Sequence, residues 1–153
     1  MQTPALLLEL PSVHHQQVRD RLSRALAEYL APFDLQDSVV TAPCIVVGRQ
    51  LAQPDVAVYP RGGLGHLWYD CLPPLFVAEI LSADTAIADR VTKRRFYLDQ
   101  GVATYWVIDP DGARVDVWFP TDVAPRQVSG VLRWTMQSAW PPFEIHVGEL
   151  TSR

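Results

Sequence analysis

Hydrophobic residues recur with a helical period near the start of the chain. Between residues 14 and 31, apolar side chains return every three or four positions, and charged residues occupy mostly the opposite face. Ser12 precedes this segment at a position suited to an N-cap, and Pro32 follows it where a helix has to end. The pattern predicts an amphipathic helix whose apolar face packs against the rest of the domain.

Continuous or alternating apolar runs predict strands in the remainder of the chain. Residues 38–47 and 55–59 are rich in valine, whereas residues 75–81 and 102–108 are almost wholly apolar, which is typical of strands covered on both faces. The segment 85–100 is predicted to be a helix, with Gly101 as its C-terminal cap. Alternating patterns predict further strands at 114–119, 132–136 and 143–147.

The order of these elements indicates a mixed α/β fold. A helix is followed by strands, a second helix and further strands, and the helix at 85–100 forms one crossover between two apolar strands. We expect a mixed central sheet flanked by helices, in three layers around a single core. At 153 residues the chain has the length of one ordinary domain, spanning residues 1–153.

Composition narrows the functional classes. The formal net charge is -4 at pH 7, so nucleic acid, if bound, has to be held by a local patch rather than by a general positive coat. No apolar run approaches the ~20 residues needed to span a bilayer. The two cysteines, Cys44 and Cys71, lack the spacing of metal ligands. We therefore expect a cytoplasmic protein with reduced thiols and no membrane partner.

Glu79 is the most unusual residue in the pattern, because it is the only charged side chain in the apolar run 75–81. Burying a carboxylate costs free energy unless a cation or a metal compensates it. Asp55 begins a neighbouring valine-rich run and can lie at the end of its strand. Two carboxylates at neighbouring strand ends form a hard-oxygen site that suits magnesium or manganese.

Lys93 is the only lysine among 13 basic residues. If the predicted helix runs back along the preceding strand, Lys93 lies ~12 Å along its axis and Glu79 ~7 Å from the strand end, so the ammonium can reach the carboxylate. A compact ammonium suits a position beside a metal-bound water better than a planar guanidinium does. The alternative is a surface lysine paired with Asp89, four residues earlier.

Several segments match one known pattern in their order and spacing. They are Pro54-Asp55-Val-Ala-Val58, Phe76-Val-Ala-Glu79-Ile-Leu-Ser82, Asp89-Arg90, Lys93, Tyr97, Gly101-Val102 and Tyr105-Trp106-Val-Ile-Asp109-Pro110, with His15, Val18, Leu22 and Leu26 before them. Together they resemble the Uma-type restriction endonuclease family, a branch of the PD-(D/E)xK nuclease superfamily, over nearly the whole chain.

The resemblance implies a restriction-endonuclease-like core in which Asp55 and Glu79 hold Mg²⁺ or Mn²⁺ and the Ile80 carbonyl completes the inner shell. The usual lysine of the superfamily lies two residues after the glutamate, where this chain has Leu81. In families of this type the basic role has moved to the following helix, which points to Lys93. Glu9 matches an acidic residue near the first helix of the family.

The implied reaction is metal-assisted hydrolysis of phosphodiester bonds in DNA, with Lys93 orienting or deprotonating the attacking water. Arg90, Arg94 and Arg95 surround the lysine and suit contacts with phosphates. We expect a homodimer, since cleavage of both strands favours two sites related by a two-fold axis. The alternative is a catalytically inactive module of the same fold that binds nucleic acid or assembles with proteins.

Other polar and aromatic residues have less specific interpretations. His14 and His15 point about 100° apart on a helix and cannot chelate one metal as a pair, so a structural role is expected. His66 lies in the glycine-rich loop 60–74 and is expected to be solvated. Trp68 and Tyr69 in the same loop either stack on bases or cover a subunit interface, and the low positive charge of the loop favours the interface.

Overall fold

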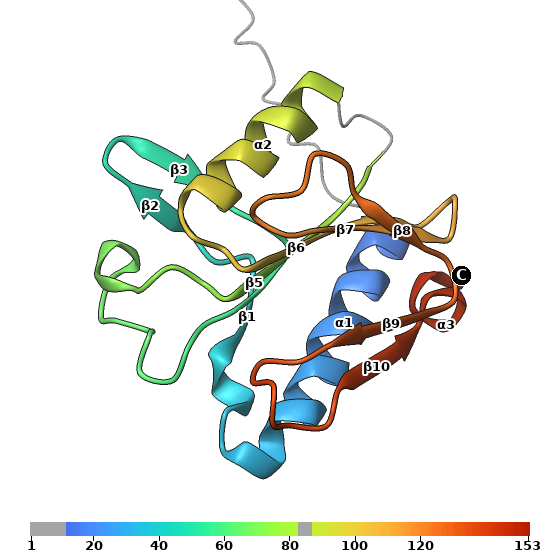
Figure 1. Ribbon diagram of the computed structural model, residues 1–153, viewed down its shortest axis with the longest axis horizontal. Helices are drawn as coiled ribbons and strands as arrows, with labels where there is room; N and C mark the ends of the chain where they lie inside the picture. The colour runs from blue at the N-terminus through green and yellow to red at the C-terminus, as the bar shows by residue number, and fades with distance from the viewer. Residues whose placement is uncertain (1–11, 83–86) are drawn as a thin grey trace, which may run out of the picture.

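The computed structural model describes residues 12–82 and 87–153, and these residues contain a six-stranded central sheet (Figure 1). Its strands are β1 (Val39–Thr41), β4 (Val56–Val58), β5 (Phe76–Ile80), β6 (Thr104–Asp109), β7 (Arg114–Trp118) and β8 (Arg126–Val128), and they lie in that order. β5 and β6 pair in parallel, while the other neighbouring strands of this sheet pair antiparallel. The mixed sheet with one crossover that the sequence predicts is therefore confirmed.

Two long helices lie on opposite faces of this sheet (Figure 1). They are α1 (Val13–Leu30) and α2 (Ile87–Asp99), and α2 forms the crossover from β5 to β6. The Ser12 hydroxyl accepts a hydrogen bond from the backbone amide of His15 at 3.0 Å, which makes it the N-cap of α1. Gly101 follows α2 with a φ of 84°, a left-handed conformation that favours glycine at this end.

The buried apolar residues form two clusters, one on each face of the sheet, where the sequence pattern predicts a single core. Successive strand residues point to opposite faces, so Phe76 and Ala78 enter the cluster under α1, whereas Val77 enters the cluster under α2. A sheet covered on both faces buries both of its surfaces, and this divides the core. The same alternation places Glu79 on the α2 face.

Several short elements lie outside these predictions. β2 (Ile45–Val47) and β3 (Gln50–Ala52) form a separate hairpin, so the predicted strand at 38–47 is two strands in two sheets, with Pro43 between them. β9 (Val131–Trp134) and β10 (Phe143–His146) form a second hairpin, followed by α3 (Val147–Thr151). Short 3₁₀ turns lie at η1 (Ala31–Phe33), η2 (Gln36–Ser38) and η3 (Trp68–Asp70).

β7 keeps the alternation that the sequence predicts, with Val115 and Val117 buried and Arg114 exposed, except at Trp118. Trp118 is 7% exposed, because the guanidinium of Arg94 on α2 lies over its ring. The α2 face of β7 is therefore covered at Trp118, while Arg114 on the same face stays exposed. Within the described residues, no helix has the length and apolar character needed to cross a membrane.

Candidate active site

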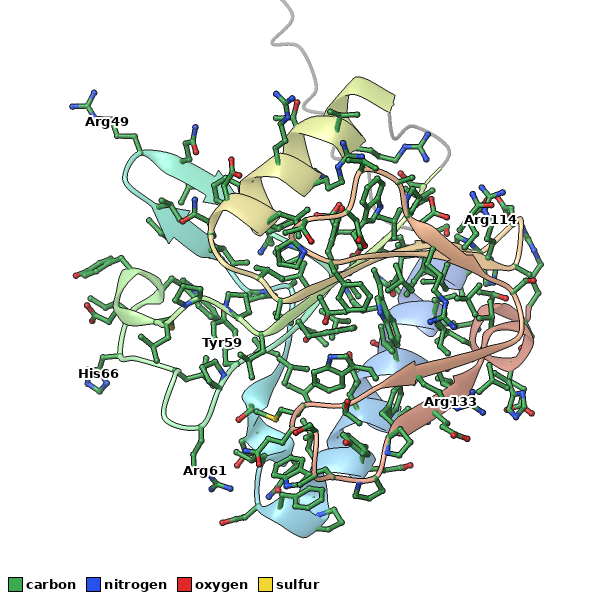
Figure 2. All side chains as sticks on the ribbon, viewed as in Figure 1. Arg49, Tyr59, Arg61, His66, Arg114 and Arg133 are labelled. Carbon is green, nitrogen blue, oxygen red and sulfur yellow. The ribbon has the colours of Figure 1, made fainter. Side chains whose placement is uncertain are left out.

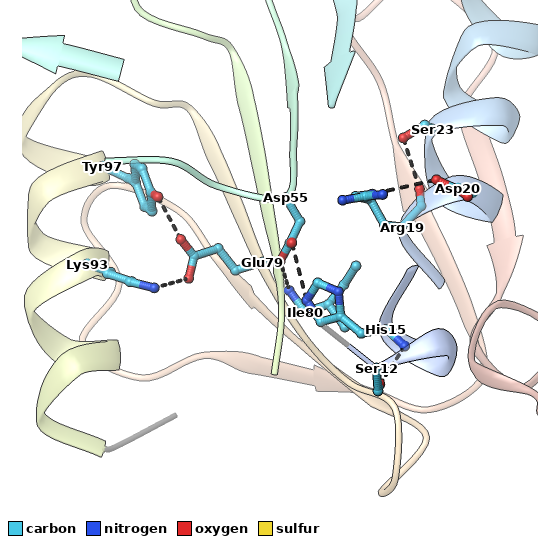
Figure 3. Close-up of polar contacts among 10 residues, drawn as sticks. All are labelled: Ser12, His15, Arg19, Asp20, Ser23, Asp55, Glu79, Ile80, Lys93 and Tyr97. Atoms are coloured by element: carbon cyan, nitrogen blue, oxygen red, sulfur yellow. Dashed lines mark hydrogen bonds and ion pairs between the residues drawn. The ribbon is translucent and has the colours of Figure 1, made fainter. Parts of the chain in front are cut away.

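Glu79 lies in the middle of the site, on the α2 face of β5, with 9% of its side chain exposed. Two residues of α2 each contact one of its carboxylate oxygens (Figure 3). The Tyr97 hydroxyl donates a hydrogen bond to Oε1 at 2.6 Å, and Lys93 Nζ lies 3.5 Å from Oε2. Lys93 and Tyr97 are four residues apart and so project from the same side of the helix. The structure thus brings Lys93 to Glu79 and adds Tyr97, to which the sequence analysis assigns no role.

Burial dominates the electrostatics of this carboxyl group. Loss of hydration is the largest cause that raises the pKa of Glu79 above its ordinary value, and the negative charge of Asp55 raises it further. Tyr97 and Lys93 lower the pKa of Glu79, but they do not offset burial. Burial and the charge of Glu79 also raise the pKa of Tyr97, so its hydroxyl stays protonated and acts as a donor.

Asp55 lies immediately before β4, at the edge of the same site. β4 and β5 are antiparallel with Val56 opposite Ala78, and extending this register by one residue brings Asp55 opposite Glu79. Asp55 Oδ2 accepts a hydrogen bond from the backbone amide of Ile80 at 2.7 Å. The Asp55 side chain thus accepts from β5 just beyond the end of β4, where a backbone carbonyl of a longer β4 would otherwise accept. This bond holds the peptide between Glu79 and Ile80 against the carboxylate.

His15 contacts the second oxygen of Asp55, a partner that the sequence pattern does not specify. Its Nε2 lies 3.2 Å from Asp55 Oδ1, and its side chain is 12% exposed (Figure 3). The hydrogen bond to Asp55 raises the pKa of His15, although burial opposes it. His14 does have a structural contact, since its Nε2 lies 2.7 Å from the carbonyl of Thr151. The position of His15 could have indicated this contact, because a histidine in the first turn of an amphipathic helix can reach the end of the sheet that the helix covers.

The three arginines around Lys93 do not point the same way. Arg90 and Arg94 line a hollow between α2 and the sheet, with the Arg94 guanidinium 4.1 Å from the centre of the Trp118 ring. Arg95 is exposed elsewhere on the helix. The two other acidic residues that the sequence singles out, Glu9 and the side chain of Asp89, lie outside the part of the chain that the structure describes.

The loop 60–74 lies apart from the carboxylates. His66 projects outward from it, as expected for a solvated loop residue (Figure 2). Trp68 is 43% and Tyr69 is 68% exposed, so both present apolar surface to solvent. None of these three side chains is needed to assemble the site around Glu79.

The oxygen donors of the site fit a hard divalent cation. Within the described part of the chain, no three His, Cys, Asp or Glu side chains group closely enough to hold a metal ion by themselves. Mg²⁺ keeps several waters and takes only one or two carboxylates from a protein, so a donor set with the two carboxylates Asp55 and Glu79 fits this ion. An added cation would also relieve the unfavourable burial that raises the pKa of Glu79.

Comparison with known proteins assigns the chain to a family and finds a solved structure with the same fold. The family model "Uma2: Putative restriction endonuclease" matches residues 7–148, so the chain belongs to this family. A solved structure described as "a putative nuclease belonging to DUF820 from Anabaena variabilis ATCC 29413" superposes with a TM-score of 0.76 at 18% identity, covering 99% of this chain and 85% of that chain. A search of curated proteins finds no match.

Proposed function

We propose that this chain is a metal-dependent endonuclease that hydrolyses phosphodiester bonds in DNA. The observation that carries the proposal is the buried Glu79 carboxylate, which lies between Lys93 and Tyr97 and next to Asp55. Such a cluster lowers the stability of a fold, and buried carboxylates with a raised pKa beside a charged partner gather at functional sites. Membership of a restriction endonuclease family supports the same reaction class.

The residues have distinct roles in this proposal. Mg²⁺ or Mn²⁺ bound by Asp55, Glu79 and the Ile80 carbonyl would polarise the phosphate and lower the pKa of a water molecule. Lys93 is 38% exposed, so its ammonium can contact both Glu79 and an approaching phosphate. As an ammonium it orients the attacking water and offsets the charge that develops on the phosphate, whereas deprotonating that water would require the neutral amine, which takes up the proton.

The neighbouring groups position the carboxylates and the substrate. Tyr97 fixes one oxygen of Glu79, and His15 fixes one oxygen of Asp55. Arg95, which is exposed on α2, supplies positive charge for the phosphates beside the cleaved bond, whereas Arg90 and Arg94 line the hollow next to the site.

Plasmid cleavage in MgCl₂ tests the proposal. We expect Asp55→Asn, Glu79→Gln and Lys93→Met each to slow cleavage by at least ~100-fold, the size of effect seen when a charge-stabilising group is removed. Glu144→Gln, which removes an exposed carboxylate on β10, should cleave like the wild type. Calorimetric titration with Mg²⁺ adds a second readout, in which the wild type binds and Glu79→Gln does not.

The outcomes separate the two candidate functions. Cleavage that survives in all three site variants would overturn the assignment of the residues. A wild-type protein that neither binds Mg²⁺ nor cleaves DNA would favour an inactive module that binds nucleic acid or assembles with proteins.

We also propose that the protein acts as a homodimer in the cytoplasm. Two copies would supply one site for each DNA strand, and the exposed apolar side chains of Leu67, Trp68 and Tyr69 are suited to covering by a second copy. Light scattering should give twice the mass of the chain for the wild type and a smaller mass for Tyr69→Ser. A wild-type mass equal to one chain at all concentrations would contradict the dimer.

A further inference from the structure

A hollow of about 210 Å³ opens between α2 and the sheet, beside the proposed active site. Its lining includes Arg90, Val91 and Arg94 from α2, together with Val107, Asp116 and Trp118 from β6 and β7. The strand register aligns Glu79, Val107 and Asp116 in one row across β5, β6 and β7. Neighbouring strands are ~4.8 Å apart, so Asp116 lies roughly 10 Å along this row from Glu79.

Two buried polar atoms at this hollow have no hydrogen-bond partner among the described residues. They are Nε of Arg90, which is a donor, and Oδ1 of Asp116, which is an acceptor. Asp116 Oδ1 also lies 3.8 Å from Arg114 Nε, which is beyond hydrogen-bond distance. Buried groups of this kind cost free energy, and a ligand that donated to Asp116 and accepted from Arg90 would recover it.

The hollow also has a surface for stacking. The Arg94 guanidinium lies 4.1 Å from the centre of the Trp118 ring and covers one face of it. Guanidinium planes and aromatic rings are the groups on which proteins stack unpaired bases. The site therefore suits a flat ligand with hydrogen-bonding edges, and in a nuclease the flat groups of the substrate are its bases.

The polar atoms distinguish among the four bases. A carboxylate accepts best from two adjacent N–H groups, and guanine carries such a pair, N1–H and N2–H, on its Watson–Crick edge. Adenine carries one donor beside one acceptor there, cytosine carries one donor beside two acceptors, and thymine carries one donor between two acceptors. Guanine also presents O6 and N7 as acceptors, which match an arginine.

We propose that this hollow binds an unpaired guanine base next to the bond that is cleaved. The inference rests on the proposed nuclease function and deepens it by naming a class of substrate. Asp116 accepts from N1–H and N2–H, Arg90 donates to the acceptor edge, and Arg94 stacks on the ring. Because pairing with cytosine occupies the edge that Asp116 reads, the substrate is single-stranded at this position or has its guanine turned out of the duplex.

Binding to short labelled oligodeoxythymidylates tests this proposal in EDTA, with fluorescence anisotropy as the readout. Each strand carries one central dG, dA, dC or dT. The wild type should bind the dG strand about 10-fold more tightly than the others, which is the discrimination of one good bidentate contact. Asp116→Asn should remove this preference, because its amide replaces one acceptor with a donor.

A second variant tests the same site without changing the charge of the protein. Val91 is 38% exposed, so Val91→Phe can fill the hollow without disturbing the core, and it should also remove the dG preference. Asp99→Asn is the matched control, because Asp99 is exposed at the end of α2 and its change removes the same charge. It should keep the preference.

Each outcome decides the matter. Equal affinity of the wild type for all four strands, or a dG preference that persists in both Asp116→Asn and Val91→Phe, overturns the guanine site. The assay contains no metal and involves no cleavage, so its failure differs from a failure of the nuclease function. Mg²⁺-dependent cleavage without a dG preference refutes only the guanine site, whereas a dG preference without cleavage supports the site and refutes the nuclease.

Discussion

Replacing Glu79 with glutamine should stabilise the metal-free protein at neutral pH. Its side chain is 9% exposed, and burial raises its pKa despite Tyr97 and Lys93. The folded state therefore binds more protons than the unfolded state between the ordinary and the raised pKa, so the free energy of unfolding falls as the pH rises through this interval. Above it the ionised carboxylate is a constant cost, which glutamine removes while Tyr97 still donates to the side-chain oxygen.

The expected gain follows from the surroundings of this carboxylate. A net upward shift of its pKa means that burial outweighs both partners, and single substitutions that remove such a cost usually change stability by a few kcal/mol at most. The substitution takes one partner from Lys93, but this side chain is 38% exposed and water solvates it at little cost. We expect a gain of about 1–2 kcal/mol, equivalent to roughly 2–8 °C in Tm for a domain of this size.

Thermal unfolding in EDTA across the acid and neutral range measures this gain. Glu79→Gln should exceed the wild type in Tm at neutral pH, and the difference should vanish in acid. Glu144→Gln, whose carboxylate is 51% exposed, should change stability by less than about 1 kcal/mol. Mg²⁺ should raise the Tm of the wild type but not that of Glu79→Gln. A glutamine variant that is less stable than the wild type at neutral pH would refute the reasoning.

Two further predictions concern the residues that hold the carboxylates. Tyr97→Phe removes the donor to Glu79 and should lower the free energy of unfolding in urea by about 1.5–3 kcal/mol at neutral pH, and by less in acid; no loss at neutral pH would contradict the contact. Asp55 raises the pKa of His15, so the stability from this pair is present below the ordinary histidine pKa and is lost as the pH rises through the folded value. His15→Gln should therefore be more destabilising near about pH 5.5 than near about pH 8.5, and an equal effect at both values would exclude a charged His15.

The central strands could be predicted from the sequence because their pattern leaves few alternatives. β5 and β6 are buried along almost their whole length, and only a strand covered on both faces accounts for runs so short and so apolar. β3 and β8 are three residues long and largely exposed. Such strands form because a partner pairs with them, and their own residues carry little pattern.

The residues of the candidate site also divide into those that the sequence pattern predicts and those that only the structure shows. Glu79 could be predicted as a site residue because its charge interrupts an apolar run. Lys93 could be predicted because a helix that returns along the preceding strand brings residue 93 close to residue 79. Tyr97 occupies an apolar position of a helix, so its hydroxyl bond to Glu79 depends on a tertiary contact that no local pattern encodes. His15 reaches Asp55 around the end of the sheet, from the layer opposite α2. Arg95 diverges from Arg90 and Arg94, because adjacent helical residues point about 100° apart, whereas residues four apart share one side of the helix.

Asp55 and Glu79 are anchored to different layers of the domain. His15 joins the first carboxylate to α1, and Lys93 and Tyr97 join the second to α2, on the other side of the sheet. A single cation shared by the two acids would consequently tie both helices to one point. Binding of the ion would then stabilise the packing of both helices on the sheet. Conversely, a change that loosened either helix would weaken binding of the ion.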